Sequence, residues 1–160
     1  MSIYRVSRSI EASIIDGITT ILVANGWSNV NVEKTFSQVY NQTPPTVCIR
    51  VGDTTHLWAE IGDNNTRREV QVLIDLFCTG DGQRLDLKDC LIAELKAGLV
   101  YYDYVITNGV VDTKTANGRI SVLEITDRPI NFDTEKDELD PIDRNRHLLI
   151  LRCSLGKIET

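Results

Sequence analysis

Residues 69–99 read EVQVLIDLFCTGDGQRLDLKDCLIAELKAGL, and this stretch decides the fold. Its first ten residues alternate with the period of two that is typical of a strand with one buried face. The predicted buried side is Val70, Val72, Ile74, Leu76 and Cys78, and the polar side holds Glu69, Gln71 and Asp75. A turn over Thr79–Gly82 leads into a predicted amphipathic helix over Gln83–Leu99. Its apolar stripe is Leu87, Leu91, Leu95 and Leu99, beside Cys90 and Gly98. The stripe can pack on the buried face of the strand, and nothing in the stretch resembles an active site.

Length and composition predict one ordinary globular domain over residues 1–160. The chain is 42% hydrophobic and 25% charged, and 160 residues are enough to build a core without disulfides or metal ions. No apolar run is long enough for a transmembrane helix. The first residues, Met1–Val6, have neither the apolar segment nor the cleavage site of a secretory signal, so we expect the protein to stay where it is made.

Charge and cysteine usage limit the possible partners. Acidic residues outnumber basic ones by 23 to 17, which gives a net charge of -6 and disfavours a broad DNA-binding face. The four cysteines are far apart in the sequence and lie within apolar runs, so we interpret them as buried hydrophobic residues in a reducing compartment. They are Cys48, Cys78, Cys90 and Cys153.

The N-terminal half is predicted to contain a helix, two strands and an exposed excursion. The helix carries isoleucines at helical spacing and would be capped by Ser7 or Ser9 and closed by Gly26. The predicted strands are Asn29–Phe36 and Thr46–Val51. Residues 52–66, with turns expected at 52–55 and 62–65, form the excursion, because they bring too few apolar residues to bury themselves.

The C-terminal half is predicted to be mostly strand. Tyr101–Thr107 would be followed by a tight turn at Asn108-Gly109, and a second turn at Asn117-Gly118 would make the region up to Asp127 a three-stranded meander. Pro129 should end the last of these strands. The acidic block 133–143 is expected to be an exposed loop, and His147–Leu155 a central strand. The fold class is therefore α+β: a mainly antiparallel β-sheet with two helices packed on one face and protruding hairpin excursions.

The sequence offers no catalytic, cofactor-binding or metal site. His56 and His147 have no ligand-type partners at suitable spacing, and the acidic block lacks the oxygen order and the glycine of a calcium loop. No phosphate-binding loop or nucleophile elbow occurs, and the apolar neighbours of each cysteine should raise its pKa. A non-enzyme is thus the prediction, although a site assembled from distant residues would be invisible at this level.

Several features favour surfaces that bind other chains. Trp58 lies in the excursion, where it is either a packing residue or an anchor on a partner. Leu73 and Phe77 fall on the nominally polar side of the long strand, where they would face a neighbouring subunit or be covered by a loop or helix. The predicted interface residues are Phe36, Tyr40, Trp58, Arg67, Arg68, Leu73 and Phe77.

The order of elements resembles that of the tail terminator proteins of long-tailed bacteriophages, also called tail completion or tail-tube capping proteins. The resemblance spans nearly the whole chain: an N-terminal helix, a strand pair with an excursion, the long strand that begins at Arg67, a leucine-rich helix, and strands to the C-terminus. It is a resemblance of layout, without a short diagnostic motif.

The resemblance implies a structural virion protein at the junction of tail and neck, assembled in the host cytoplasm. Such proteins form a hexameric ring that stops polymerisation of the tail tube and presents the surface that joins the head. The implied partners are further copies of the chain, the tail tube protein, neck or connector proteins and, where the tail is contractile, the sheath protein. DNA would pass through the ring without specific binding, and no cofactor is implied.

Two alternatives stay open. Another neck protein, such as a head-closure or adaptor protein, shares the size and the oligomeric habit. A small α+β enzyme or ligand-binding domain is the alternative from another class, and it should be a monomer or dimer with a metabolite pocket.

Overall fold

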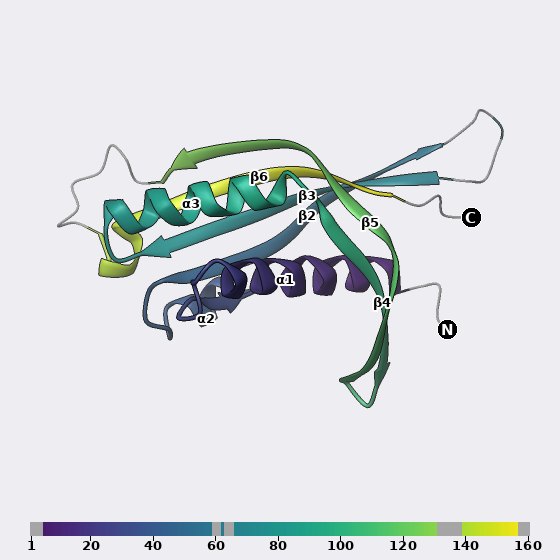
Figure 1. The fold of residues 1–160 in the computed structure, drawn as a ribbon, viewed down its shortest axis with the longest axis horizontal. Helices are drawn as coiled ribbons and strands as arrows, with labels where there is room; N and C mark the ends of the chain where they lie inside the picture. The colour runs from purple at the N-terminus through teal and green to yellow at the C-terminus, as the bar shows by residue number, and fades with distance from the viewer. Residues whose placement is uncertain (1–4, 59–61, 63–65, 131–138, 157–160) are drawn as a thin grey trace.

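A single six-stranded sheet with helices on both faces forms the protein in the computed structural model, which describes residues 5–58, 62, 66–130 and 139–156 (Figure 1). The elements in chain order are α1 (Val6–Ala24), β1 (Asn31–Glu33), α2 (Phe36–Val39), β2 (Thr46–Trp58), β3 (Thr66–Cys78), α3 (Asp81–Leu95), β4 (Leu99–Thr107), β5 (Val110–Pro129), the 3-10 helix η3 (Pro141–Asp143) and β6 (Asn145–Leu155). The strand order is β1-β2-β3-β6-β5-β4, and only the pairing of β1 with β2 is parallel. The predicted α+β class is confirmed.

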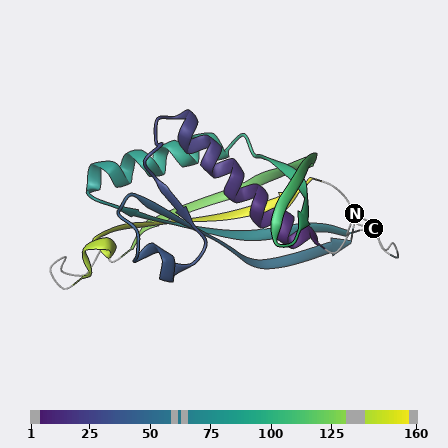
Figure 2. The ribbon, with the colours of Figure 1, turned by 90° about the horizontal axis from the view of Figure 1, so that it is seen from below.

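The alternation in β3 determines which face of the sheet is the main core. Its predicted buried residues are all buried, and they pack beneath α1 and α3, which lie together on one face (Figure 2). The residues of α1 and α3 that complete this core are Ile10, Ile14, Ile18, Leu22, Leu87, Leu91 and Leu95. Two helices on one face were predicted, and the spacing of their apolar residues is the physical reason for the layer.

Among the described residues, the helices on the second face of the sheet cover one end of it. There Phe36 and Val39 of α2 and Ile142 of η3 pack with Cys48 of β2 and Phe77 of β3. Figure 2 shows α2 on the side of the sheet opposite α3. Elsewhere on this face Leu73 and Ile150, paired across β3 and β6, are only half-buried.

The predicted boundaries of the two long helices need correction. Neither Ser7 nor Ser9 caps α1, because Arg5 occupies the N-cap position without a side-chain hydrogen bond. Gly26 does adopt the predicted left-handed conformation, with φ of 84°. Helix α3 ends at Leu95 instead of Leu99, since Gly98 has φ of 77° and Leu99 already begins β4.

Two predicted turns are strand instead. Residues 52–55 continue β2 through an irregularity between Val51 and Thr54, so β2 and β3 form one long hairpin, here called the first arm. Asn117 and Gly118 lie inside β5, where the Asn117 side chain donates to Asp103 at 2.5 Å. A β-bulge absorbs the glycine there, opposite a register shift between Val100 and Tyr102. The predicted meander is therefore a single hairpin of β4 and β5, the second arm.

Other strand predictions are confirmed. Asn108 and Gly109 both have positive φ, 53° and 79°, as a two-residue hairpin turn requires. Pro129 is the last residue of β5, and β6 lies centrally between β3 and β5. The first predicted strand is shorter than expected, Asn31–Glu33. Most of the acidic block lies outside the described residues; within its described end, Asp140 caps η3 by accepting from the Ile142 amide.

Helix α1 also protects one edge of the sheet. The buried Ser13 hydroxyl accepts from the Tyr102 amide at 2.9 Å and donates to the Tyr102 carbonyl at 3.4 Å. Arg5 donates to the Ile106 carbonyl at 3.2 Å. These bonds satisfy backbone groups that an edge strand would otherwise present to another chain, so the middle of β4 is not a free edge.

Candidate interaction surfaces

A buried carboxylate organises the covered end of the second face. Asp75 on β3 is fully buried and lies between two arginines on the flanking strands. Arg50 donates to one carboxylate oxygen at 2.8 Å, and Arg146 donates to the other through Nη2 at 2.7 Å and Nε at 3.1 Å. A buried carboxylate needs such partners, because burying an unpaired charge is costly. We call Asp75, Arg50, Arg146, Phe36 and Phe77 the Asp75 cluster.

Aromatic rings also contact the two guanidinium groups of the Asp75 cluster. The Arg50 guanidinium lies 4.1 Å from the centre of the Phe36 ring, and that of Arg146 lies 5.0 Å from the rings of both Phe36 and Phe77. The two rings meet edge to face at 6.3 Å between centroids. The cations are thus held between a carboxylate and aromatic faces, which fixes α2 on the sheet.

Three of the predicted interface residues meet at the Asp75 cluster, but not all of them are at the surface. Tyr40 packs on Phe77 with 6.4 Å between ring centroids, and its hydroxyl donates to the two carboxylate oxygens of Asp143 in η3 at 3.0 and 3.2 Å. Phe77 is 0% exposed, so within one chain it is a core residue covered by α2 and its neighbours. Phe36 is half-buried and Tyr40 is 45% exposed, so these two remain accessible.

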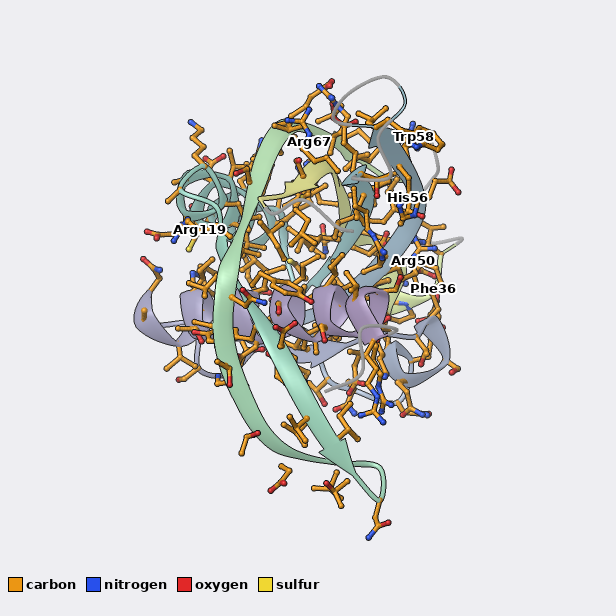
Figure 3. All side chains as sticks on the ribbon, turned by 90° about the vertical axis from the view of Figure 1, so that its right-hand side faces the viewer. Phe36, Arg50, His56, Trp58, Arg67 and Arg119 are labelled. Carbon is orange, nitrogen blue, oxygen red and sulfur yellow. The ribbon has the colours of Figure 1, made fainter. Side chains whose placement is uncertain are left out.

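The other predicted interface residues lie on or near the first arm. Trp58, at the end of β2, is 66% exposed, and Arg67 is exposed close to it across the hairpin (Figure 3). Arg68, which pairs with His56 near the described end of this arm, donates to the Ser7 hydroxyl at 2.8 Å and so links the arm to the start of α1. Leu73 lies further along β3, half-buried on the second face. Three of the seven predicted residues therefore lie at the Asp75 cluster and three near the described end of the first arm, while Leu73 pairs with Arg50 of the cluster.

A groove that sequence reasoning did not predict runs between α1 and the inner side of the second arm. It is open to solvent and has a volume of about 560 Å³. Its lining residues are Arg8, Glu11, Ala12, Ile15, Asp16, Thr19, Lys34, Tyr104, Ile106, Val111 and Lys114. The rim carries two ion pairs: Lys114 with Asp16 at 2.6 Å, and Lys34 with Glu11 at 3.7 Å. The floor between them is apolar.

A histidine network, also unpredicted, ties α3 to the sheet. His147 is 2% exposed; its Nδ1 lies 2.7 Å from Arg84, and its Nε2 lies 2.8 Å from Asp127. Because an arginine can only donate, Nδ1 is the acceptor and Nε2 carries the proton. Burial lowers the pKa of His147 despite the hydrogen bond to Asp127, and the charges of Arg84 and Lys88 lower it further.

The pKa of the Asp127 carboxyl group is lowered, although the group is partly buried. Burial alone would raise its pKa, but the hydrogen bond from His147 and the positive charge of Lys88, 3.4 Å away, together lower the pKa of Asp127. Both ring nitrogens of His147 are engaged within this network. The arrangement is that of a structural tie and not of a base poised next to a nucleophile.

The cysteines behave mainly as predicted. Burial raises the pKa of Cys48 to about 11 and the pKa values of Cys78 and Cys153 to about 12. Cys90 is half-buried, and its pKa is also raised. Among the described residues, no group of three or more potential ligands is placed to hold a metal ion, and no helix is long and apolar enough to cross a membrane.

The fold and these surfaces define an α+β protein with a mostly antiparallel six-stranded sheet, helices on both faces and two projecting hairpin arms. No family model matches the chain, and no curated protein matches it. Seven solved chains match in structure. One belongs to a structure described as "Virion of native gene transfer agent (GTA) particle"; the match has a TM-score of 0.51 and 13% sequence identity, and it covers 98% of this chain and 99% of that chain. At this identity the likeness shows a shared fold.

Proposed function

We propose that this chain is a structural virion protein of a phage-like particle, acting as one domain over residues 1–160. The observation that carries the proposal is the end-to-end match with a chain of the gene transfer agent virion. The match spans nearly the whole of both chains, 98% of this one and 99% of the other. Function does not follow from fold alone, so the surfaces have to support the proposal as well.

The finer proposal is a hexameric ring that caps the tail tube and ends its polymerisation. Ring closure needs two different patches on each subunit, because a head-to-tail contact repeats around the axis. Two arms of different sequence project from the sheet and provide such patches (Figure 1). The net charge of -6 is also suitable for a channel wall that DNA passes without binding.

Capping can be tested directly with tube protein from the same particle. Tube subunits are allowed to polymerise with and without the purified chain, and tube lengths and ends are measured by negative-stain electron microscopy. We expect elongation to stop and a ring to be visible at one tube end. Unchanged elongation, together with unmodified tube ends, would refute the capping role.

The other neck proteins are the competing structural role, and the same images separate them. A head-closure or adaptor protein would bind to the connector of a filled head and leave free tube ends untouched. An enzyme or ligand-binding domain would bind neither and would instead take up a metabolite. Incubation with purified heads and with tubes in parallel therefore assigns the chain to one of these classes.

A further inference from the structure

Exposed apolar side chains are concentrated on the two arms. Of the nine large hydrophobic residues that are exposed in the described part of the chain, six lie on the arms. These are Leu57 and Trp58 on the first arm and Val105, Val110, Val111 and Leu123 on the second. Clustered exposed apolar side chains mark contact surfaces, whereas single ones are ordinary.

The first arm presents an anchor. Residues 52–58 are all exposed, and Trp58 and Leu57 are 66% and 38% exposed. A tryptophan side chain buries roughly 150–250 Å² when covered, so Trp58 has on the order of 100–150 Å² still to bury. Tryptophan is also among the residues that most often dominate binding energy at interfaces. A two-stranded ribbon is marginal alone, so contact with a partner would stabilise the arm.

The second arm and α1 form the groove that would accept the first arm of another copy. The groove has a volume of about 560 Å³ and is open to solvent, so side chains of another chain can enter it. Its floor is formed by Ala12 and Ile15 of α1 and by Tyr104, Ile106 and Val111 of the arm. Its rim charges are already paired and solvent-exposed, so they contribute little to affinity, and apolar contact decides what binds.

We propose that the first arm of one copy, led by Trp58, docks in the groove of the next copy; this rests on the proposed ring function. The occupant is a second copy because anchor and groove are different patches on the same chain. Each subunit can then give one arm and receive another, which is the head-to-tail contact that closes a ring. In a closed ring every anchor is buried and every groove is filled.

The size of this contact sets the conditions of the test. Eleven of the described residues line the groove, which is fewer than the roughly 20–30 residues a side of a standard interface. A single contact should therefore be weak, and closure of the ring would strengthen it through effective concentration. Self-association has to be measured up to about 1 mM, where even a weak specific contact is populated.

The test uses one variant for each half of the contact. Trp58→Ala removes the anchor, and Ala12→Arg fills the groove while keeping a good helix former in α1. Leu85→Ala, an exposed apolar residue of α3 outside both patches, is the matched control. Mass is measured by analytical ultracentrifugation over the concentration series, after circular dichroism has shown that each variant is folded.

We expect the wild type and Leu85→Ala to associate, and each docking variant to associate at least about 30-fold more weakly. An equimolar mixture of Trp58→Ala and Ala12→Arg should form dimers and nothing larger, because the intact arm of one fits the intact groove of the other. A Trp58→Ala protein that associates like the wild type would overturn the docking proposal without contradicting the proposed ring. A wild type that is monomeric at about 1 mM would also overturn it, while tube capping, assayed separately, would still report on the proposed function.

Discussion

Replacement of Asp75 by asparagine should be among the most damaging single changes in this protein. The side chain keeps its shape, but the carboxylate that accepts from Arg50 and Arg146 becomes a neutral amide. Two guanidinium groups then share a site without a counter-charge. They are 35% and 20% exposed, so water reaches them only in part.

The magnitude follows from these exposures. Removing one partner of a buried ion pair typically costs about 3–5 kcal/mol. Partial exposure of both arginines allows some rehydration, so we expect a loss of about 2–4 kcal/mol in the free energy of unfolding. Arg146→Met should cost more than Arg50→Met, because Arg146 is the less exposed and makes two of the three hydrogen bonds.

Urea unfolding followed by circular dichroism measures these differences. Asp16→Asn is the matched control, because the Asp16–Lys114 pair is solvent-exposed and should change stability by less than about 1 kcal/mol. If Asp75→Asn unfolds within about 0.5 kcal/mol of the wild type, the carboxylate is not compensating the two arginines and the argument for the cluster fails.

Three further predictions test other parts of the fold. His147 is protonated near its ordinary pKa of 6.5 in the unfolded chain, but only at lower pH in the folded chain. The free energy of unfolding should therefore fall as the pH drops below about 6.5, and it should level off below the pKa that His147 has in the folded chain. His147→Gln should flatten that step in urea titrations between about pH 5 and 8; an unchanged slope would contradict the neutral histidine. Maleimide labelling followed by mass spectrometry should modify Cys90 first and the other three cysteines only on unfolding, and rapid labelling of Cys153 would refute their burial. Gly98→Ala should lower the free energy of unfolding by about 1–3 kcal/mol, because the new Cβ would lie 2.8 Å from the Ile120 carbonyl oxygen and residue 98 has a φ of 77°. Gly82→Ala, where α3 leaves open space for a Cβ, is the control and should be neutral or stabilising. Equal effects of the two substitutions would disprove the close approach at Gly98.

The features that sequence reasoning predicted well are those with a local cause. Alternation in 69–78 defined the buried face, leucines four residues apart defined the stripe of α3, and Asn108-Gly109 defined a hairpin. Each depends on the steric and hydrophobic preferences of neighbouring residues. Asn117-Gly118 has the same composition but lies in a strand, because pairing with β4 and β6 outweighs the turn preference of two residues.

The candidate surfaces were predictable only in part, because they combine residues that are distant in the chain. Arg50, Asp75 and Arg146 come from three strands, and nothing in the sequence says that they meet. Phe77 was correctly placed on the second face, but whether it met solvent, a partner or α2 depended on where the chain returned. The groove needs α1 and the second arm to lie side by side.

The class of fold and the inward face of each long element follow from local patterns, since periodicity and turn chemistry act over a few residues. The folded chain was needed for three other features: β2 and β3 stay paired as far as Trp58 and Thr66 with Trp58 exposed, a carboxylate is buried between two arginines, and α1 forms a groove with the second arm. These features arise from contacts between distant segments, whose free energies depend on the packing of the whole chain and not on any local pattern.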